Sequence, residues 1–284
     1  MNPPTSPGPN ISSMPACWHI KRRMEPAPMA LIDFAVRGNL AEVRLNRPAT
    51  LNAINAEMDR ALAQAWARID SDPDIRVALL TGAGDRAFCA GADISDPPIA
   101  QDGLSFGGGL TGIGGRLVPL QKPLIAVVHG HVLGLGFEMA MCADILIAAD
   151  DTQFRLPEAR AGLIDHCGVV HRAIRQLPHH VAMAMIIASE PLDAARALHF
   201  GLVNEIAPLA DLAATTERWT RRILACAPLV SQAGKQAALL GLDHGLKTAL
   251  SRRYPLIDAH AATADCREAA SAWKEKRVPK WQGR

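Results

Sequence analysis

The sequence lacks a long apolar run, paired cysteines and any strong excess of charge. Its 284 residues contain 30 Lys and Arg against 28 Asp and Glu, a net charge of +2, and aromatic residues make up only 4%. This balance disfavours a nucleic-acid binder, which usually carries a clear basic excess. No apolar run reaches the roughly 18 residues of a membrane-spanning helix. Collagen-like, coiled-coil and disordered classes are also excluded by composition, so we expect a soluble globular protein with neither nucleic acid nor membrane as partner.

The cysteines form no C-x-x-C pair and are widely scattered along the chain. A chain of this size does not need a disulfide framework, and the ligand spacing of a zinc site is absent. We therefore predict reduced thiols, no metal and a cytoplasmic location. The six residues are Cys17, Cys89, Cys142, Cys167, Cys226 and Cys266.

Residues 1–28 differ from the rest, being proline-rich without hydrophobic periodicity. The basic cluster Lys21–Arg23 follows the weakly apolar part, whereas in a signal peptide it would precede the apolar part. We interpret this stretch as a flexible tail. Met24 and Met29 remain alternative start residues.

Regular patterns begin near residue 31. Residues 40–45 (LAEVRL) alternate apolar and polar side chains, which predicts a half-exposed strand. Asn55 is placed to cap a helix that ends near Asp72 and Pro73. The predicted apolar stripe of this helix is formed by Met58, Leu62, Trp66 and Ile69.

Three short, nearly continuous apolar runs follow, at residues 75–82, 124–130 and 144–150. Runs of this kind are typical of strands buried on both faces of a largely parallel sheet. Beyond about residue 208 the pattern is helical only. The sequence therefore predicts an α/β core with repeated crossovers, followed by a helical C-terminal module.

Several motif matches are weak. Residues 82–87 (GAGDRA) fit the G-x-G-x-x-A dinucleotide pattern, but Pro97 and Pro98 follow too closely for the long helix that this motif requires. No G-x-S-x-G elbow is present. His166 and His171 are spaced wrongly for one helical face, so we expect no metal site there. The glycine-rich segment 96–118 is long and irregular, and we expect it to shape a substrate entrance.

Three other stretches carry candidate chemistry. Residues 87–94 (AFCAGADI) form a turn of small residues whose amides can approach a ligand closely. In residues 129–144 a glycine-rich turn opens a helix with Glu138 in its first turn, where free N–H groups suit a partly negative oxygen. Residues 154–163 place Glu158 after an extended piece and Pro157. Taken alone, each glutamate also has a non-catalytic interpretation. Glu138 can be a carboxylate favoured by the helix dipole at a helix start, and Glu158 an ordinary acidic residue after a strand.

Together these stretches resemble the crotonase superfamily, the enoyl-CoA hydratase/isomerase family, from about residue 31 to the C-terminus. The motifs are LNRPATLNAI (45–54), GAGDRAFCAGADI (82–94), the G-x-G-x-E turn ending at Glu138 and FRLPEA (154–159). The ending AWKEKRVPKWQGR and the loop FGGGLTG look closest to the carnitinyl-CoA dehydratase-like branch. The resemblance implies a ββα spiral core over residues 29–208 that binds acyl-CoA. It also implies a helical module over 209–284 for oligomerisation and for covering CoA.

The resemblance implies an enzyme that holds an acyl-CoA thioester and stabilises its enolate through two backbone N–H groups. By motif position these belong to Ala92 and to Leu135, where the family often has glycine. Glu138 and Glu158 match the two glutamates of the hydratase branch. The implied activity is that of an enoyl-CoA hydratase or acyl-CoA dehydratase, with no cofactor apart from the coenzyme A of the substrate.

The CoA contacts follow from the same resemblance. Trp273 and Lys276 match an aromatic residue and a lysine that close over the nucleotide, often from a neighbouring subunit. An alternative is that Trp273 packs on its own chain. Arg47 is a candidate phosphate contact by its charge. The expected contacts along the CoA, largely through backbone groups, are Ala49, Thr50, Leu51, Ala90, Asp93 and Ile94.

One departure from the family pattern follows Glu158. The family usually has a Pro-Gly or Pro-Asp pair leading into a glycine-rich turn, whereas this chain reads LIDHCGVVHR (163–172). Asp165 and His166 would therefore approach the catalytic water. His166 can be a third catalytic residue, since its side chain titrates near neutral pH, a specificity contact or a simple substitution. The acyl group is expected to be selected by the 96–118 segment, Phe137 and His166.

Two other functions stay open. One is an enoyl-CoA or dienoyl-CoA isomerase that uses one carboxylate with help from His166. The other is a catalytically silent acyl-CoA-binding or assembly subunit. The family assembles as trimers or pairs of trimers, so we expect a homotrimer or homohexamer.

Overall fold

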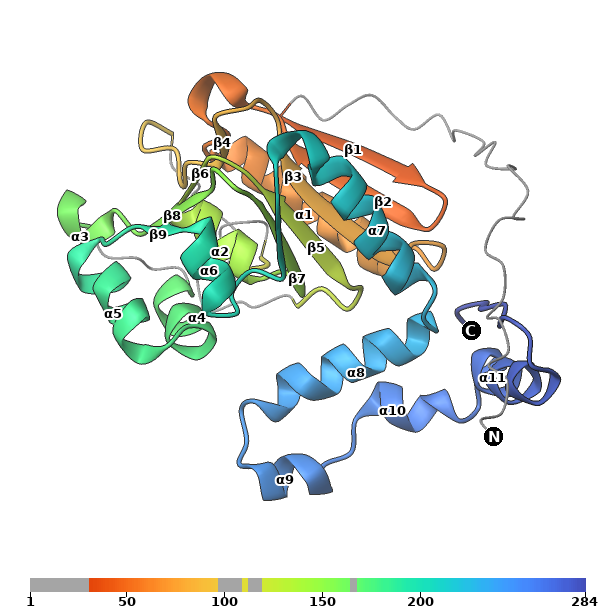
Figure 1. Ribbon diagram of the computed structural model, residues 1–284. Coiled ribbons are helices and arrows are strands. Elements are labelled where there is room, and N and C mark those ends of the chain that lie inside the picture. The colour runs from red at the N-terminus through yellow and green to blue at the C-terminus, as the bar shows by residue number, and fades with distance from the viewer. Residues whose placement is uncertain (1–30, 97–108, 112–118, 164–167) are drawn as a thin grey trace, which may run out of the picture.

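The computed structural model describes residues 31–96, 109–111, 119–163 and 168–284. The predicted tail at 1–28, most of the 96–118 segment, and Asp165 and His166 lie outside the described residues. Within the described ranges the chain forms an α/β core with two sheets, from which a helical arm extends (Figure 1).

The larger sheet contains the predicted buried strands. Its order is β1-β2-β3-β5-β7-β10. Strands β1 and β2 form an antiparallel hairpin, and every other neighbouring pair is parallel. This confirms the prediction of a largely parallel sheet. The strands are β1 (Ile32–Arg37), β2 (Leu40–Leu45), β3 (Val77–Gly82), β5 (Leu124–Val128), β7 (Ile145–Ala149) and β10 (Glu205–Ala207).

The strands of the smaller sheet lie in the order β4-β6-β8-β9, which parallels the order β3-β5-β7 in the larger sheet. Strands β4, β6 and β8 follow β3, β5 and β7 directly, so the two sheets grow together as a spiral. Gly130 makes the bend between β5 and β6 with φ 54°, and a Cβ there would lie 2.1 Å from the Arg86 carbonyl oxygen, which only glycine avoids. The strands are β4 (Ala87–Cys89), β6 (His131–Leu133), β8 (Gln153–Arg155) and β9 (Leu192–Asp193).

Helix α1 (Ala56–Ser71) has the predicted cap and apolar stripe. The Asn55 side chain accepts a hydrogen bond from the Met58 N–H, which satisfies one of the free amides at the helix start. The helix ends with Asp72 as its C-cap. The four stripe residues are all buried in the main core: Met58, Leu62, Trp66 and Ile69.

Helices cover both faces of the core. Helix α7 (Leu212–Leu224) packs Leu212, Trp219 and Ile223 on one face of the larger sheet. A group of short helices lies beside the smaller sheet (Figure 1). These are α2 (Leu135–Met141), α3 (Glu158–Ala161), α4 (Val169–Gln176), α5 (His179–Ala188) and α6 (Ala194–His199), and two 3₁₀ turns lie at η1 (Pro48–Thr50) and η3 (Leu209–Asp211).

The remaining helices form an arm that leaves the core (Figure 1). They are α8 (Pro228–Gly241), α9 (Leu246–Ser251), α10 (Pro255–His260) and α11 (Ala264–Glu275), with α10 packed on α8. Leu242, Leu246 and Leu250 are 72%, 75% and 78% exposed on this arm. The boundary near residue 208 between the predicted core and the C-terminal module stays a prediction.

Among the described residues, no single helix is long and apolar enough to cross a membrane. One pair of helices in the described part of the chain, Leu209–Leu224 and Pro228–Gly241, meets the length and hydropathy criteria jointly, but it is bent by 96°.

Candidate active site

Two loops that the sequence motifs singled out lie side by side at the end of the core. The Ile54 N–H donates to the Gly91 carbonyl at 2.8 Å, and the Asp93 N–H donates back to the Ile54 carbonyl at 2.8 Å. The Arg47 guanidinium forms an ion pair with the Asp93 carboxylate at 3.0 Å. Residues 45–54 and 87–94 therefore form one unit, although more than thirty positions separate them in the chain.

Asn52 holds the first loop in an unusual conformation. Leu51 and Asn52 both have left-handed backbones, with φ 54° and 57°. The Asn52 side chain is fully buried; it accepts from the Arg47 N–H and donates to the carbonyls of Ala83, Ala87 and Phe88. Sequence reasoning missed this residue; the one available signal was that asparagine tolerates the left-handed region.

The predicted CoA contacts Ala49, Thr50 and Ile94 are solvent-exposed on this unit, Ile94 at 86%. The Ser95 hydroxyl and then the Arg47 guanidinium hold the pKa of the Asp93 carboxyl down to about 2, so that Asp93 is ionised at neutral pH. Because Arg47 is already paired with Asp93, its contact with a CoA phosphate stays a prediction.

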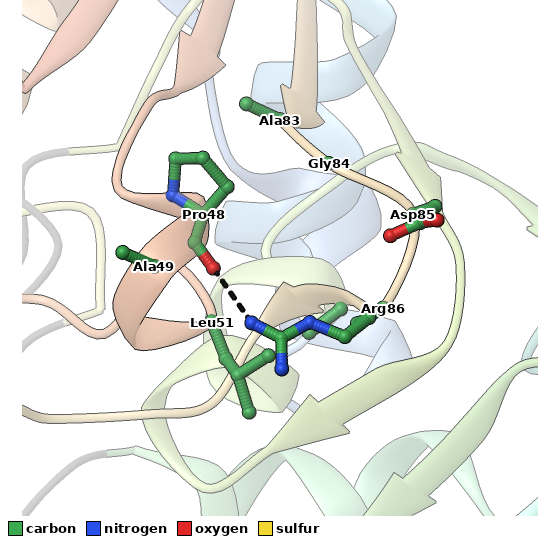
Figure 2. A pocket seen from close by; sticks show the side chains of 8 residues that line it. Pro48, Ala49, Leu51, Ala83, Gly84, Asp85 and Arg86 are labelled. Atoms are coloured by element: carbon green, nitrogen blue, oxygen red, sulfur yellow. Dashed lines mark hydrogen bonds between the residues drawn. The ribbon is translucent and has the colours of Figure 1, made fainter.

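A small cavity of about 270 Å³ opens beside the turn at residues 48–51 (Figure 2). In it, the Arg86 guanidinium donates to the Pro48 carbonyl oxygen at 3.2 Å. The Ala90 N–H donates to the Leu51 carbonyl at 2.9 Å from the adjoining loop. The cavity is lined by Pro48, Ala49, Leu51 and residues 83–87.

The two predicted amide donors lie close together. A Cβ placed on Gly91 would be 3.6 Å from the Leu135 nitrogen, so the Gly91–Ala92 peptide lies against the start of α2. Over the described ranges, neither the Ala92 N–H nor the Leu135 N–H donates to a protein acceptor. Both amides are thus able to donate to a bound oxygen. The Leu135 side chain is only 3% exposed, so it is accommodated in the core.

Glu158 reaches the same place from another element. It begins α3, and its Oε1 lies where a side chain on Gly134 would be, 2.4 Å from an ideal Cβ at that position. Gly134 has φ 46° and ψ −116°, a backbone conformation that L-residues rarely adopt. Glycine at position 134 therefore leaves room for the Glu158 carboxylate beside the start of α2.

Glu138 lies one turn into α2, where its N–H donates to the Gly134 carbonyl at 3.0 Å. Its side chain is fully buried and forms an ion pair with Arg172 of α4. The structure thus brings Glu138 and Glu158 to the first turn of α2, one from within the helix and one against Gly134. Arg172 was missed from the sequence, because nothing in the run HRAIRQ distinguishes it from Arg175.

The neighbouring Phe137 is fully buried and packs on Phe154, with ring centroids 5.2 Å apart. Its predicted contact with the acyl group stays a prediction.

Trp273 lies on α11 and Lys276 is the C-cap residue of this helix. Figure 1 shows α11 well separated from β4 and α2. Trp273 and Lys276 line a cavity of about 600 Å³ with Arg277 and Trp281. Trp273 is 87% exposed, so within the described ranges it does not pack on its own chain. The fold therefore does not bring these residues to the site of the same chain.

The described ranges contain no group of three or more His, Cys, Asp or Glu side chains placed to hold a metal ion. After β3 the chain bends into strand β4 and opens no helix for a dinucleotide phosphate. Burial raises the pKa of the Cys89 and Cys142 thiols to about 12, so both remain protonated at neutral pH.

Known proteins resemble this chain over most of its length. The enoyl-CoA hydratase/isomerase family model matches residues 35–284. The chain is 34% identical to (E)-benzylidenesuccinyl-CoA hydratase of Thauera aromatica, covering 89% of this chain and 99% of that protein. It is 33% identical to carnitinyl-CoA dehydratase of Proteus mirabilis, covering 89% and 98%.

Solved structures of enoyl-CoA hydratases also resemble this chain. A Novosphingobium aromaticivorans protein, provisionally assigned as a short chain enoyl-CoA hydratase, superposes with a TM-score of 0.86 at 48% identity over 90% of this chain and 99% of that one. An enoyl-CoA hydratase from Mycobacterium tuberculosis superposes with a TM-score of 0.83 at 31% identity, covering 90% and 100%.

The spiral of paired sheets and the matching neighbours define an enzyme of the crotonase fold. This chain belongs to the enoyl-CoA hydratase/isomerase family.

Proposed function

We propose that this protein is an enoyl-CoA hydratase or acyl-CoA dehydratase, which reversibly adds water across the 2,3 double bond of an acyl-CoA thioester. One observation carries this proposal: the Ala92 and Leu135 amides, which donate to no acceptor in the described ranges, and the Glu158 carboxylate adjoin the start of α2, whose first turn carries Glu138. The two curated relatives named above, a hydratase and a dehydratase of CoA thioesters, support the same reaction class.

The amides would bind the thioester oxygen. When water adds at C3, negative charge moves onto this oxygen, and the Ala92 and Leu135 N–H groups stabilise the enolate more than the ground state. Removing one donor of such a pair costs about 3–4 kcal/mol in transition-state stabilisation. This pair would therefore supply a large share of the rate enhancement.

The two carboxylates divide the proton transfers. The ion pair with Arg172 favours the ionised form of Glu138, and two carboxylates in one site resist being ionised together. Glu158 is therefore the member that would hold a proton and deliver it to C2. Glu138 accepts a hydrogen bond from the water and takes its proton as the C–O bond forms at C3. The dehydration runs these steps in reverse, and solvent restores the protonation states of the two glutamates.

Hydration of crotonyl-CoA tests the function, followed as loss of absorbance of the conjugated thioester. We expect turnover without added metal or cofactor, and no turnover above background in a variant carrying both Glu138→Gln and Glu158→Gln. Migration of the double bond without water uptake would favour an isomerase. Tight acyl-CoA binding without turnover of any thioester tested would favour a silent binding subunit.

We also propose a cytoplasmic homotrimer or homohexamer in which one subunit completes the CoA site of the next. The exposed leucines of the arm provide apolar surface for such a contact. Trp273 and Lys276, remote from the site of their own chain, would then close over the nucleotide of a neighbour.

Trp273→Ala is expected to raise the KM for acyl-CoA about tenfold with kcat nearly unchanged. Stacking of a base on an aromatic ring contributes about 1–3 kcal/mol, and tenfold corresponds to about 1.4 kcal/mol. Steady-state kinetics measures both constants. Val278→Ala, on the same tail and 79% exposed, is the matched control. An unchanged KM in the Trp273 variant would exclude Trp273 from the CoA site.

A further inference from the structure

The guanidinium of Arg172 connects three parts of the molecule. Its Nη1 donates to the Glu138 carboxylate and to the Thr111 carbonyl at 2.8 Å, and its Nη2 lies 3.5 Å from the Leu110 carbonyl. Arg172 comes from α4 and Glu138 from α2. Leu110 and Thr111 belong to the 96–118 segment that is predicted to shape the substrate entrance. The Arg172 side chain is 21% exposed, whereas Glu138 is fully buried.

Gly168 leaves the space that this contact needs. A Cβ at position 168 would lie 2.2 Å from Arg172 Nη1 and 2.9 Å from both Glu138 Oε1 and the Thr111 oxygen. The φ of Gly168 is −73°, which any residue adopts. Glycine at this position is therefore explained by the space it leaves, and not by backbone freedom.

We propose that Arg172 is a positioning residue for the reaction, whose guanidinium holds Glu138 ionised and oriented toward the catalytic water. This inference rests on the proposed hydratase function. A buried carboxylate without a cation would tend to take up a proton. The guanidinium is itself held in place, because Nη1 also donates to the Thr111 carbonyl and Nη2 lies near the Leu110 carbonyl, so it can fix the charge and the orientation of Glu138 together.

Arg172 is the cation that forms an ion pair with Glu138 in the described ranges. The other titratable groups near Glu138 are as follows. Cys89 of β4 and Cys142 at the end of α2 have pKa values raised to about 12 by burial and stay neutral. His131 of β6, and His171 and Arg175 of α4, are solvent-exposed. Glu158, whose Oε1 adjoins Gly134 at the start of α2, is the other proposed catalytic carboxylate, and its negative charge would oppose ionisation of Glu138.

Arg172→Met is expected to lower kcat at neutral pH about a hundredfold, with KM changed less than threefold. The acidic limb of the kcat profile is expected to move upward by about one to three pH units. The sign follows from the charge: with Arg172 present, Glu138 stays ionised to lower pH, and without it Glu138 protonates, and activity falls, at higher pH. Arg172→Lys keeps the charge and should restore part of kcat and most of the wild-type pH profile.

Arg175→Met is the matched control, since Arg175 lies on the same helix, is exposed and donates only to the backbone of its own helix at His171 in the described ranges. It should leave kcat and the pH profile unchanged. Gly168→Ala provides a second variant that keeps the charge of Arg172 and fills its space. It should lower kcat without loss of the fold.

A pH profile in Arg172→Met identical to wild type would overturn the proposal, even if the variant were less stable. Thermal unfolding separates this outcome from failure of the hydratase function. If the ion pair forms, Arg172→Met should lower Tm by different amounts in the wild-type and Glu138→Gln backgrounds. Equal shifts would overturn the pairing, whether or not any acyl-CoA is turned over.

Discussion

Glu158→Gln is expected to lower kcat for hydration by about 10²- to 10⁴-fold, because glutamine cannot deliver a proton to C2. The amide has the same shape as the carboxyl and fits the same space beside Gly134. Substrate binding should therefore be retained, and KM should change little. Steady-state kinetics with crotonyl-CoA measures both values, and exchange of the C2 proton with solvent deuterium reports the lost step directly.

Glu138→Gln should lower kcat by a similar factor. The affected step is activation of the water, whereas Glu158→Gln affects proton transfer to C2. Glu190→Gln serves as the control, because Glu190 is exposed and follows the end of α5. Near-full hydratase activity in either active-site variant would remove the assignment of that glutamate.

Gly134→Ala is expected to reduce kcat by about 10³-fold or more, an effect comparable to losing an acid catalyst or an oxyanion donor. Two causes act together. A Cβ at position 134 would lie 2.4 Å from Glu158 Oε1 and would displace that carboxylate. The backbone at φ 46° and ψ −116° would also be strained, which would turn the neighbouring Leu135 amide.

Gly38→Ala separates the two causes of the Gly134 effect. Gly38 also has a positive φ, 60°, in the hairpin between β1 and β2, but a Cβ there meets nothing within 4 Å. This control should cost stability through strain alone and keep kcat. If Gly134→Ala retained wild-type kcat, the proposed placement of Glu158 against Gly134 would be wrong.

Features set by local patterns could be predicted from the sequence. The Asn55 cap and the stripe Met58, Leu62, Trp66 and Ile69 are confirmed, because capping and helical periodicity act over a few residues. The buried parallel strands are confirmed for a similar reason: a strand covered on both faces must be apolar throughout. The motifs around Glu138 and Glu158 led to the family because they occupy short, contiguous stretches.

Contacts between distant segments could not be predicted in this way. Arg172 lies 34 positions from Glu138 in the chain. Its helix contains a second arginine, Arg175, and the sequence does not show which of the two contacts Glu138. Asn52 binds carbonyls 31 to 36 positions away. In a single sequence, no local periodicity marks a side chain whose partner lies on another element.

The chain alone determined the α/β class, the parallel strands, the main helix cap and the candidate glutamates, since each depends on neighbouring residues. Only the tertiary structure decided that Gly134 adjoins Glu158, that Arg172 engages Glu138 across the gap left by Gly168, and that Trp273 lies far from its own site. These relations arise when separate elements pack together, because packing fixes distances that chain order leaves free.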